Sequence, residues 1–473
     1  MKIKNLSLVL LSSAFIVITS LVILKSYESE TLVEAKWNEK EEPLLAISID
    51  GKESDSFPST SNYTGTVTCS NGNGIISWNG NKWVFNVTGI SKNKARCNVA
   101  FIKILYLKDI ILGDNNANVS EPSTTPGSEI SSSTEAVLAS TSDDYGTSYY
   151  FRGAVTNNYV EYANMCWRIV RVTGNGAIKL VLYNYNGLTS TNNTPSSSTP
   201  CNVTGNNLAL ARYEGDVFDS IFNSSCGDNV YVGFMYGTAG ASSYAAAHSN
   251  TNPSAILTNL NKWYTNVLSK QANFNNTQLA DTIWCNDKSV VTDATFNPGN
   301  YSLGTNYGYG TNINYYSSAK RLVQSSSWNP GGTGPSLICP NDNNGGKLSK
   351  FTVSDTKYGN GTLKNYAKLG LLTADELAFA GSGYNTANST FYLKDNANSA
   401  GYGWLTLSPA SYYGGIASFW SVNGYTLDLE SISTCGTRLD GSSGGVRPAL
   451  SLISTTKISS GTGTATDPYK VTF

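Results

Sequence analysis

One uncharged run, LSLVLLSSAFIVITSLVIL, constrains the topology of this chain most; it covers residues 6–24 and follows Lys2 and Lys4. As a helix it spans roughly 28 Å, close to the ~30 Å hydrocarbon core of a bilayer. The run continues into VILKSYESE, which lacks the small-x-small cleavage site of a secretory signal. We therefore expect a cytoplasmic tail over 1–5 and an uncleaved signal-anchor in the cell membrane, with the bulk of the chain extracellular. A cleaved signal peptide is the alternative, and it also places the bulk of the chain outside.

The composition of the chain limits the classes of molecule that it is expected to bind. The formal net charge is −1 and 14% of residues are charged. We therefore expect no nucleic acid, which needs a basic protein face, and no polybasic contact with anionic lipid. The eight cysteines suit an oxidising compartment, and because the chain has one histidine, they indicate disulfides rather than zinc. We expect no metal and no cofactor.

The chain divides into segments of different composition. Residues 25–43 form a charged stalk, and 44–112 contain short β-rich runs between Gly, Asn and Ser turns, which predict a small all-β sandwich. A disulfide between Cys69 and Cys97 would join strands across that sandwich. Residues 113–142 are rich in Ser, Thr and Pro, which predicts a flexible linker.

Residues 143–473 mix helical and strand patterns and predict an α+β domain. TNPSAILTNLNKWYTNVL has the apolar stripe of a helix that begins near Pro253. TADELAFAG predicts a second helix, because Thr373 and Glu376 have the spacing of a capping box. FWSV-NG-YTLD predicts a β-hairpin.

The same region carries a specific series of motifs: FRGAVTNNYVEYANMCWRIVRV, VYVGFMYGTAG, LNKWYTNVL, WCND, LGLLTADELAFAG, WLTLSPA and GVRPALSL. In order and spacing, over about residues 143–455, they resemble an uncharacterised domain family of exported proteins from low-GC Gram-positive bacteria. Members carry a tryptophan with a Ser-Pro pair, followed by a Gly-Val-Arg-Pro strand. The matching positions here are Trp404, Ser408, Pro409, Arg447 and Pro448.

The closing pattern is also similar to C-type-lectin-like domains of bacteria, which include the sulfatase-modifying group. The resemblance therefore implies a C-type-lectin-like fold, but it brings no established activity. Cys166 departs from the family pattern and Cys435 precedes the arginine strand, so these two could bridge the first and last strands of the domain. The other pairs would then be Cys201–Cys226 and Cys285–Cys339.

Arg447 stands inside an apolar strand, GVRPALSL. An arginine fork can satisfy several backbone carbonyls and stack on an indole. We therefore expect Arg447, Trp404, Ser408 and Pro409 to hold the fold together, with a ligand contact at Arg447 as the alternative.

Catalytic motifs are weak. GSSGG (441–445) matches the nucleophile elbow but precedes a strand, and His248, the only histidine, is expected to be exposed or to cap a helix. CPNDNNGG (339–346) lacks the later glutamate of a calcium loop. Carboxylates for glycoside hydrolysis could come from Asp375–Glu376 or Asp428–Glu430, although helix capping explains the first pair.

Aromatic side chains remain as candidates for recognition. We expect ligand contacts from the two groups Tyr307 and Tyr309, and Tyr412, Tyr413, Trp420 and Tyr425. Aromatic faces among Asn and Ser amides suit sugar rings and protein epitopes alike. The sequence thus favours a membrane-anchored bacterial surface protein that binds an extracellular glycan or protein. An extracellular glycan hydrolase and a structural surface or appendage component are the alternatives.

Overall fold

The computed structural model describes residues 44–89, 96–293, 295–298, 307–323, 325–326, 329–330, 332–341, 349–397, 403–422, 429–433 and 444–472. Two units are present, divided between Leu105 and Tyr106. The predicted anchor and stalk (6–43) lie outside the described residues. No helix within the described part is long and apolar enough to cross a membrane.

The small unit is all-β. Its main sheet has the order β2-β1-β6-β3, and β4 and β5 form a separate hairpin. The strands are β1 Leu44–Ile49, β2 Lys52–Glu53, β3 Tyr63–Cys69, β4 Asn73–Trp78, β5 Trp83–Thr88 and β6 Arg96–Lys103. Side chains from both sheets, among them Ile47, Trp83 and Phe101, share one apolar core. The Cys69–Cys97 disulfide is confirmed, but it joins register partners on β3 and β6 within one sheet rather than crossing the sandwich.

The large unit begins earlier than expected. Helix α1 (Leu107–Leu112) belongs to it, and the Leu107 amide donates to the Thr456 carbonyl at 2.9 Å. The predicted flexible linker over 113–142 is wrong, because its end forms strand β7 (Ala136–Asp143), which pairs with β8 along its whole length. Buried ion pairing at Glu135 holds the segment in place, as described below.

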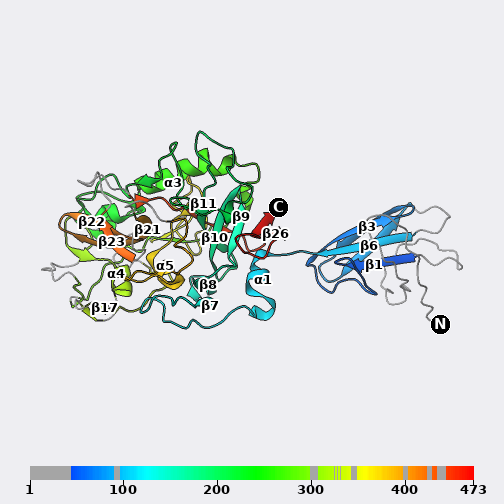
Figure 1. Cartoon of the computed structure of the whole chain (residues 1–473). Coiled ribbons are helices and arrows are strands. Elements are labelled where there is room, and N and C mark those ends of the chain that lie inside the picture. Colours follow the sequence, from blue (N-terminus) through cyan, green and yellow to red (C-terminus); the bar gives the residue numbers. More distant parts are fainter. Residues whose placement is uncertain are drawn as a thin grey trace. The chain divides into compact units, whose positions relative to one another are not determined.

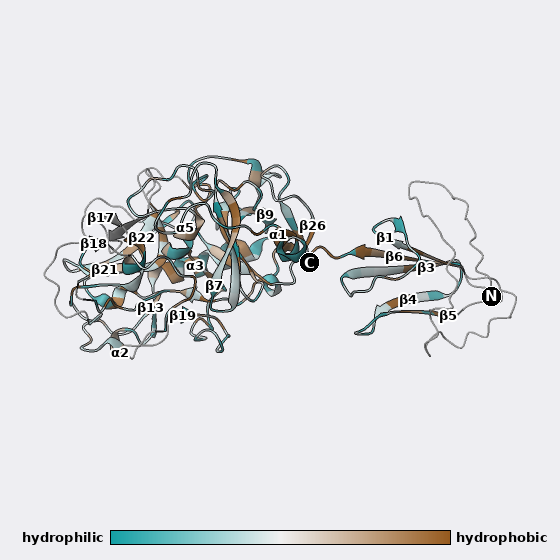
Figure 2. Ribbon diagram, turned by 90° about the horizontal axis from the view of Figure 1, so that it is seen from below, coloured by the Kyte–Doolittle hydropathy of each residue, from teal (hydrophilic) through white to brown (hydrophobic). Residues whose placement is uncertain are grey.

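The larger sheet of this unit has the order β20-β25-β11-β10-β9-β27-β26, with β8 also paired to β10, and its strands β8 to β11 lie together in Figure 1. Its strands are β8 Gly146–Gly153, β9 Tyr159–Tyr162, β10 Met165–Val172, β11 Ile178–Asn184, β20 Leu369–Gly370, β25 Ala449–Leu452, β26 Lys457–Ser460 and β27 Tyr469–Thr472. Hydrophobic colouring follows several of the inner strands, and the loops are mostly hydrophilic (Figure 2). All residues of β10 and β11 are buried.

A second sheet has the order β12-β24-β21-β22-β23, with β16 paired to β21. Its strands are β12 Asp219–Ser220, β16 Asn314–Tyr315, β21 Trp404–Tyr413, β22 Ile416–Val422, β23 Leu429–Ser433 and β24 Gly444–Gly445. Strands β22 and β23 pair antiparallel, as the predicted hairpin requires, but Val422 is the register partner of Leu429. The predicted Asn-Gly connection is therefore wrong, since it would place the second strand directly after Gly424, and residues 423–428 lie outside the described residues. Three short pairs complete the strands: β13 Met235–Tyr236 with β14 Asn252–Pro253, β15 Trp284–Cys285 with β19 Lys350–Phe351, and β17 Ser325–Ser326 with β18 Asn329–Pro330. The chain is therefore mixed and sheet-rich.

The helices follow local sequence signals. They are α2 Tyr244–Ala247, α3 Ala255–Asn266, α4 Ser317–Leu322 and α5 Ala374–Ala380. The apolar stripe of α3 is buried, but its cap is Ser254, whose Oγ accepts from the Leu257 amide, so Pro253 precedes the helix. The capping box of α5 is confirmed: Thr373 Oγ1 accepts from the Glu376 amide and the Glu376 carboxylate accepts from the Thr373 amide.

Two of the expected disulfides are wrong. Cys166 on β10 pairs with Cys201, which excludes both Cys166–Cys435 and Cys201–Cys226. The loop after β11 folds back on the sheet, where Asn184 Nδ2 donates to the Pro200 carbonyl and brings Cys201 next to β10. Cys285–Cys339 is confirmed, Cys226 is also disulfide-bonded, and Cys435 lies outside the described residues. Disulfides of this kind indicate an extracellular or secreted protein.

Candidate functional site

Two of the four aromatic residues expected to contact a ligand around the predicted hairpin are core residues. Trp420 and Tyr412 are each 1% exposed; Trp420 Nε1 donates to Ser318 Oγ and the Tyr412 hydroxyl to the Gly227 carbonyl. Tyr413 is 39% exposed, and Tyr425 lies outside the described residues. The predicted ligand contacts at Trp420 and Tyr412 are therefore wrong, because both rings are buried in the core.

The other aromatic pair is accessible. Tyr307 is 45% exposed and stacks on Tyr309 with ring centroids 5.5 Å apart. Tyr309 packs partly against the core. The two rings do not line either of the cavities described below.

Arg447 makes the kinds of contact that the sequence suggested. Its Nε donates to the Leu182 carbonyl at 2.9 Å, its Nη1 to the Leu393 carbonyl at 2.6 Å, and its guanidinium lies 4.7 Å from the Trp404 ring. Burial, followed by the charge of Arg168, lowers the pKa of Arg447 to about 9. Ser408 Oγ accepts from the Ala374 amide and so caps α5, while Pro409 lies within β21.

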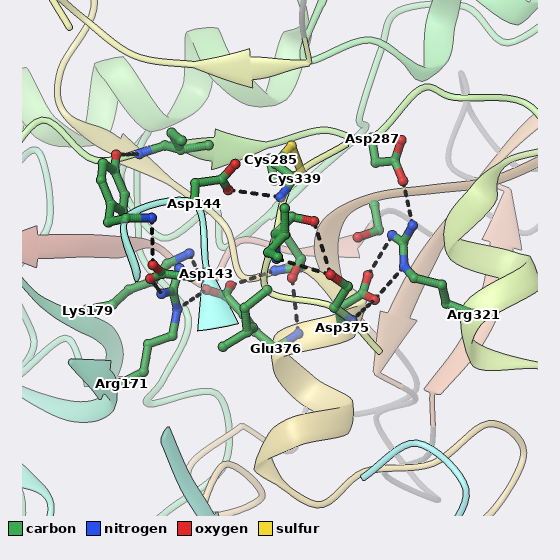
Figure 3. Close-up of a pocket in the computed structure, with 17 residues that line it drawn as sticks. Asp143, Asp144, Arg171, Lys179, Cys285, Asp287, Arg321, Cys339, Asp375 and Glu376 are labelled. Carbon is green, nitrogen blue, oxygen red and sulfur yellow. Dashed lines mark hydrogen bonds and ion pairs between the residues drawn. A yellow bond between two sulfur atoms is a disulfide. The ribbon is translucent and has the colours of Figure 1, made fainter. Parts of the chain in front are cut away.

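Residues of β7, β10, β11, β21, α4 and α5, together with the Cys285–Cys339 bridge, line a charged cavity (Figure 3). We call it the ionic cavity. Its volume is about 20 Å³, room for about one water molecule. The ionisable side chains that line it are Asp143, Asp144, Arg171, Lys179, Asp287, Arg321, Asp375 and Glu376.

Glu376 is the centre of one ion-pair cluster. Its Oε1 accepts from Arg171 Nε at 3.0 Å and from Lys179 Nζ at 2.6 Å, and Arg171 also binds Asp143 at 2.6 Å. Burial would raise the pKa of Glu376, but the charges of Lys179 and Arg171 and its capping hydrogen bond hold it at about 2. Burial lowers the pKa of Lys179 to about 8 against the attraction of Glu376.

Arg321 on α4 is the centre of a second cluster (Figure 3). It binds Asp375 with Nε and Nη2 at 2.7 and 2.9 Å, and Asp287 with Nη1 at 2.7 Å. These two carboxylates raise the pKa of Arg321 against its burial. Nearby, Asp144 accepts from the Cys339 amide and from Lys350.

The ionic cavity is therefore built for stability. Each of its five carboxylates is engaged by a cation within 3.0 Å. A general acid for glycoside hydrolysis needs a raised pKa, and Glu376 has the opposite shift. The cavity is also too small for a sugar ring, and the described residues include no group of three or more His, Cys, Asp or Glu able to hold a metal. Of the other acidic pair, Asp428 lies outside the described residues.

A second, larger depression has a different character, and we call it the hydroxyl groove. It has a volume of about 630 Å³ and is lined by parts of 124–133 and 383–390 together with Leu322. Eight serine and threonine side chains line it, and Glu129 is its only charged residue. Tyr384 contributes a half-buried ring, which meets Trp420 edge-on with centroids 5.5 Å apart. Trp420 thus lies behind the groove rather than at a ligand.

The walls of the hydroxyl groove are held by buried side chains. Arg152 donates to the Glu129 carbonyl at 3.0 Å and pairs with Glu135 at 3.1 Å, and neither side chain is exposed. Asn388 Nδ2 donates to Ser131 Oγ and to the Gly381 carbonyl at 2.8 and 2.7 Å. The contact between Asn388 and Ser131 joins the two wall segments, which are 257 residues apart in the sequence.

Sequence reasoning missed this groove, because one wall lies in the segment whose composition predicted a linker. The sequence signal that could have indicated the groove is the Ser/Thr-rich stretch itself, followed by Glu135, which the structure shows to be buried.

The comparisons offer no analogue for either cavity. No protein-family model, no curated protein and no solved structure matches this chain. The family resemblance and the C-type-lectin-like fold therefore stay predictions.

Proposed function

We propose that this is an extracellular binding protein that takes an uncharged glycan in the hydroxyl groove. The observation that carries the proposal is a groove of about 630 Å³ lined by eight hydroxyl side chains and a tyrosine ring, with one charge. The membrane anchor over residues 6–24 and the C-type-lectin-like fold of the large unit are parts of the same proposal.

The chemistry of the groove suits a sugar. A volume of this size lies within the range of small-ligand sites, ~300–1,000 Å³. Serine hydroxyls can donate and accept, which matches the hydroxyls of a sugar, and Ser128, Ser133 and Ser389 are exposed in the groove. The other five hydroxyls already hydrogen-bond within the protein and shape the walls: Thr124, Ser131, Ser132, Thr386 and Thr390. The Tyr384 ring offers an apolar face for the C–H face of a pyranose, and Trp420 supports that ring from behind.

Rigid walls support the proposal as well. The hydrogen bonds from Arg152 and Asn388 fix both wall segments before any ligand arrives, which lowers the entropy lost on binding. The hydrolase alternative finds no support at the ionic cavity, where the carboxylates are paired.

A glycan array probed with the purified full-length chain tests this function. The groove-blocking variant is Ala387→Arg, because Ala387 is exposed and lines the groove. The matched control is Ala239→Arg, at an exposed alanine that does not line it. We expect saturable binding to neutral glycans by the wild type and by Ala239→Arg, and its loss in Ala387→Arg.

Binding that survives Ala387→Arg would move the site elsewhere, with the exposed Tyr307–Tyr309 loop next in line. Absence of glycan binding in the wild type would contradict the proposal and favour a protein ligand or a structural role.

A further inference from the structure

A buried lysine and a buried asparagine meet side chain to side chain in the large unit. Lys288 Nζ lies 2.6 Å from Asn250 Oδ1, and the two residues are 0% and 5% exposed. Asn250 follows α2, and Lys288 follows β15, so the contact joins segments 38 residues apart.

Both partners are fixed by their surroundings. The Lys288 backbone carbonyl accepts a hydrogen bond from the Tyr244 hydroxyl at 2.6 Å. The Lys288 Nζ atom lies 5.5 Å from the centre of the Phe351 ring. Asn250 has a φ of 57°, a left-handed conformation that asparagine adopts at low cost. The reacting groups are thus held together in an environment poor in water.

His248 precedes Asn250 by two residues, and the charge of Lys288 acts on its ring, so we assign it as the base. Its Nε2 lies 2.8 Å from the Gly308 carbonyl, which only accepts, so Nε2 carries the proton and Nδ1 has a free lone pair. Nδ1 is buried and has no hydrogen-bond partner. Burial, followed by the charge of Lys288, lowers the pKa of His248 well below its ordinary value, so the ring is uncharged at neutral pH.

We propose that Lys288 and Asn250 form an intramolecular amide crosslink. Cγ of Asn250 is bonded to the oxygen that Nζ contacts, so the electrophilic carbon lies one bond beyond the hydrogen bond. Fixed proximity of this kind converts a very slow reaction between a lysine and an amide into a unimolecular one.

The reaction balances without a co-reactant. His248 Nδ1 accepts a proton from the Lys288 ammonium, and the amine lone pair attacks Asn250 Cγ. The Nζ–Cγ bond forms, the Cγ–Nδ2 bond breaks, and His248 returns its proton to the departing nitrogen. Ammonia leaves and takes up the second amine proton as ammonium.

The intact mass of the reduced, denatured full-length chain is the test. We expect a mass one ammonia below that calculated from the sequence, and a branched peptide that contains both residues after proteolysis. A full mass, with two unbranched peptides, would overturn the proposal.

Variants separate the crosslink from a succinimide at Asn250, which also releases ammonia. Lys288→Met abolishes the deficit if the crosslink is its source and leaves it unchanged if a succinimide is, which would overturn the proposal. The matched control is Lys320→Met, at a partly exposed lysine that binds Asp293, and it should keep the deficit. His248→Gln should slow the reaction in freshly synthesised chain, and crosslinking at the wild-type rate would refute the role of His248.

Discussion

Replacing Glu376 with glutamine tests most directly whether the ionic cavity stabilises the fold. The Glu376 carboxylate forms ion pairs with Arg171 and Lys179 and also completes the α5 capping box. Glutamine keeps the shape and an acceptor for the Thr373 amide but removes the charge. Lys179 then stays buried with no carboxylate on its ammonium, whereas Arg171 keeps Asp143.

The expected loss of folding stability in Glu376→Gln follows from the lowered pKa of Glu376. A fall in the pKa of Glu376 from 4.5 to about 2 corresponds to about 3 kcal/mol of stability at neutral pH. That figure agrees with the ~3–5 kcal/mol lost when one partner of a buried ion pair is removed. Because the folded pKa is the lower one, this stability is fully present above pH 4.5 and is lost as the pH falls toward about 2.

Guanidinium unfolding of the full-length chain, followed by tryptophan fluorescence, measures the effect. Trp284 reports on the site directly, since its ring lies 4.8 Å from Lys179 Nζ. Glu376→Gln should lose about 3 kcal/mol at pH 7 and about 1.4 kcal/mol, less than half as much, at pH 3. Lys179→Met in the same chain should recover part of the loss, because it removes the unpaired charge.

A control pair is available at the surface. Lys262 and Glu214 form an ion pair in which both side chains are largely exposed, so Glu214→Gln should cost about 0–1 kcal/mol. If Glu376→Gln costs no more than that control, or if the loss is independent of pH, the reasoning about the ionic cavity is wrong.

Three further predictions concern the groove wall, a disulfide and Arg447. Asn388→Ala removes hydrogen bonds between the groove walls and should weaken glycan binding by about tenfold (about 1.4 kcal/mol), whereas the exposed Asn193→Ala should not; equal affinities would contradict the rigid-wall argument. Peptide mapping without reduction should recover Cys166 linked to Cys201, and a Cys166–Cys435 peptide would refute that connectivity. Arg447→Met removes the guanidinium that donates to the Leu182 and Leu393 carbonyls. It should lower the free energy of unfolding by about 1–3 kcal/mol and leave glycan binding intact. A variant that loses binding at unchanged stability would make Arg447 a ligand contact.

Local signals were the predictable part of the fold. The capping box at Thr373 and Glu376 depends on residues three positions apart, so the local sequence is enough to predict it. The antiparallel pairing of β22 was predicted too, but its partner strand begins at Leu429 rather than directly after the Asn-Gly pair. The Cys69–Cys97 disulfide could also be predicted from the sequence, because the small unit contains no other cysteine.

Features that depend on distant partners were not predictable in the same way. The composition of residues 113–142 indicates a linker, yet Arg152 and Asn388, far along the chain, satisfy the polar groups of this segment and order it. The sequence predicts a surface ring at Trp420, because no local pattern indicates that Ser318 accepts its indole N–H in the core. His248 was expected at the surface or at a helix cap; it is fully buried at the C-cap of α2.

Calorimetric titration of a neutral glycan from the array into the full-length chain tests the central claim most directly. The account predicts one site per chain, an unchanged affinity for Ala239→Arg, and an affinity at least about tenfold weaker for Ala387→Arg. An Ala387→Arg variant that binds as tightly as the wild type would show that the hydroxyl groove is not the binding site.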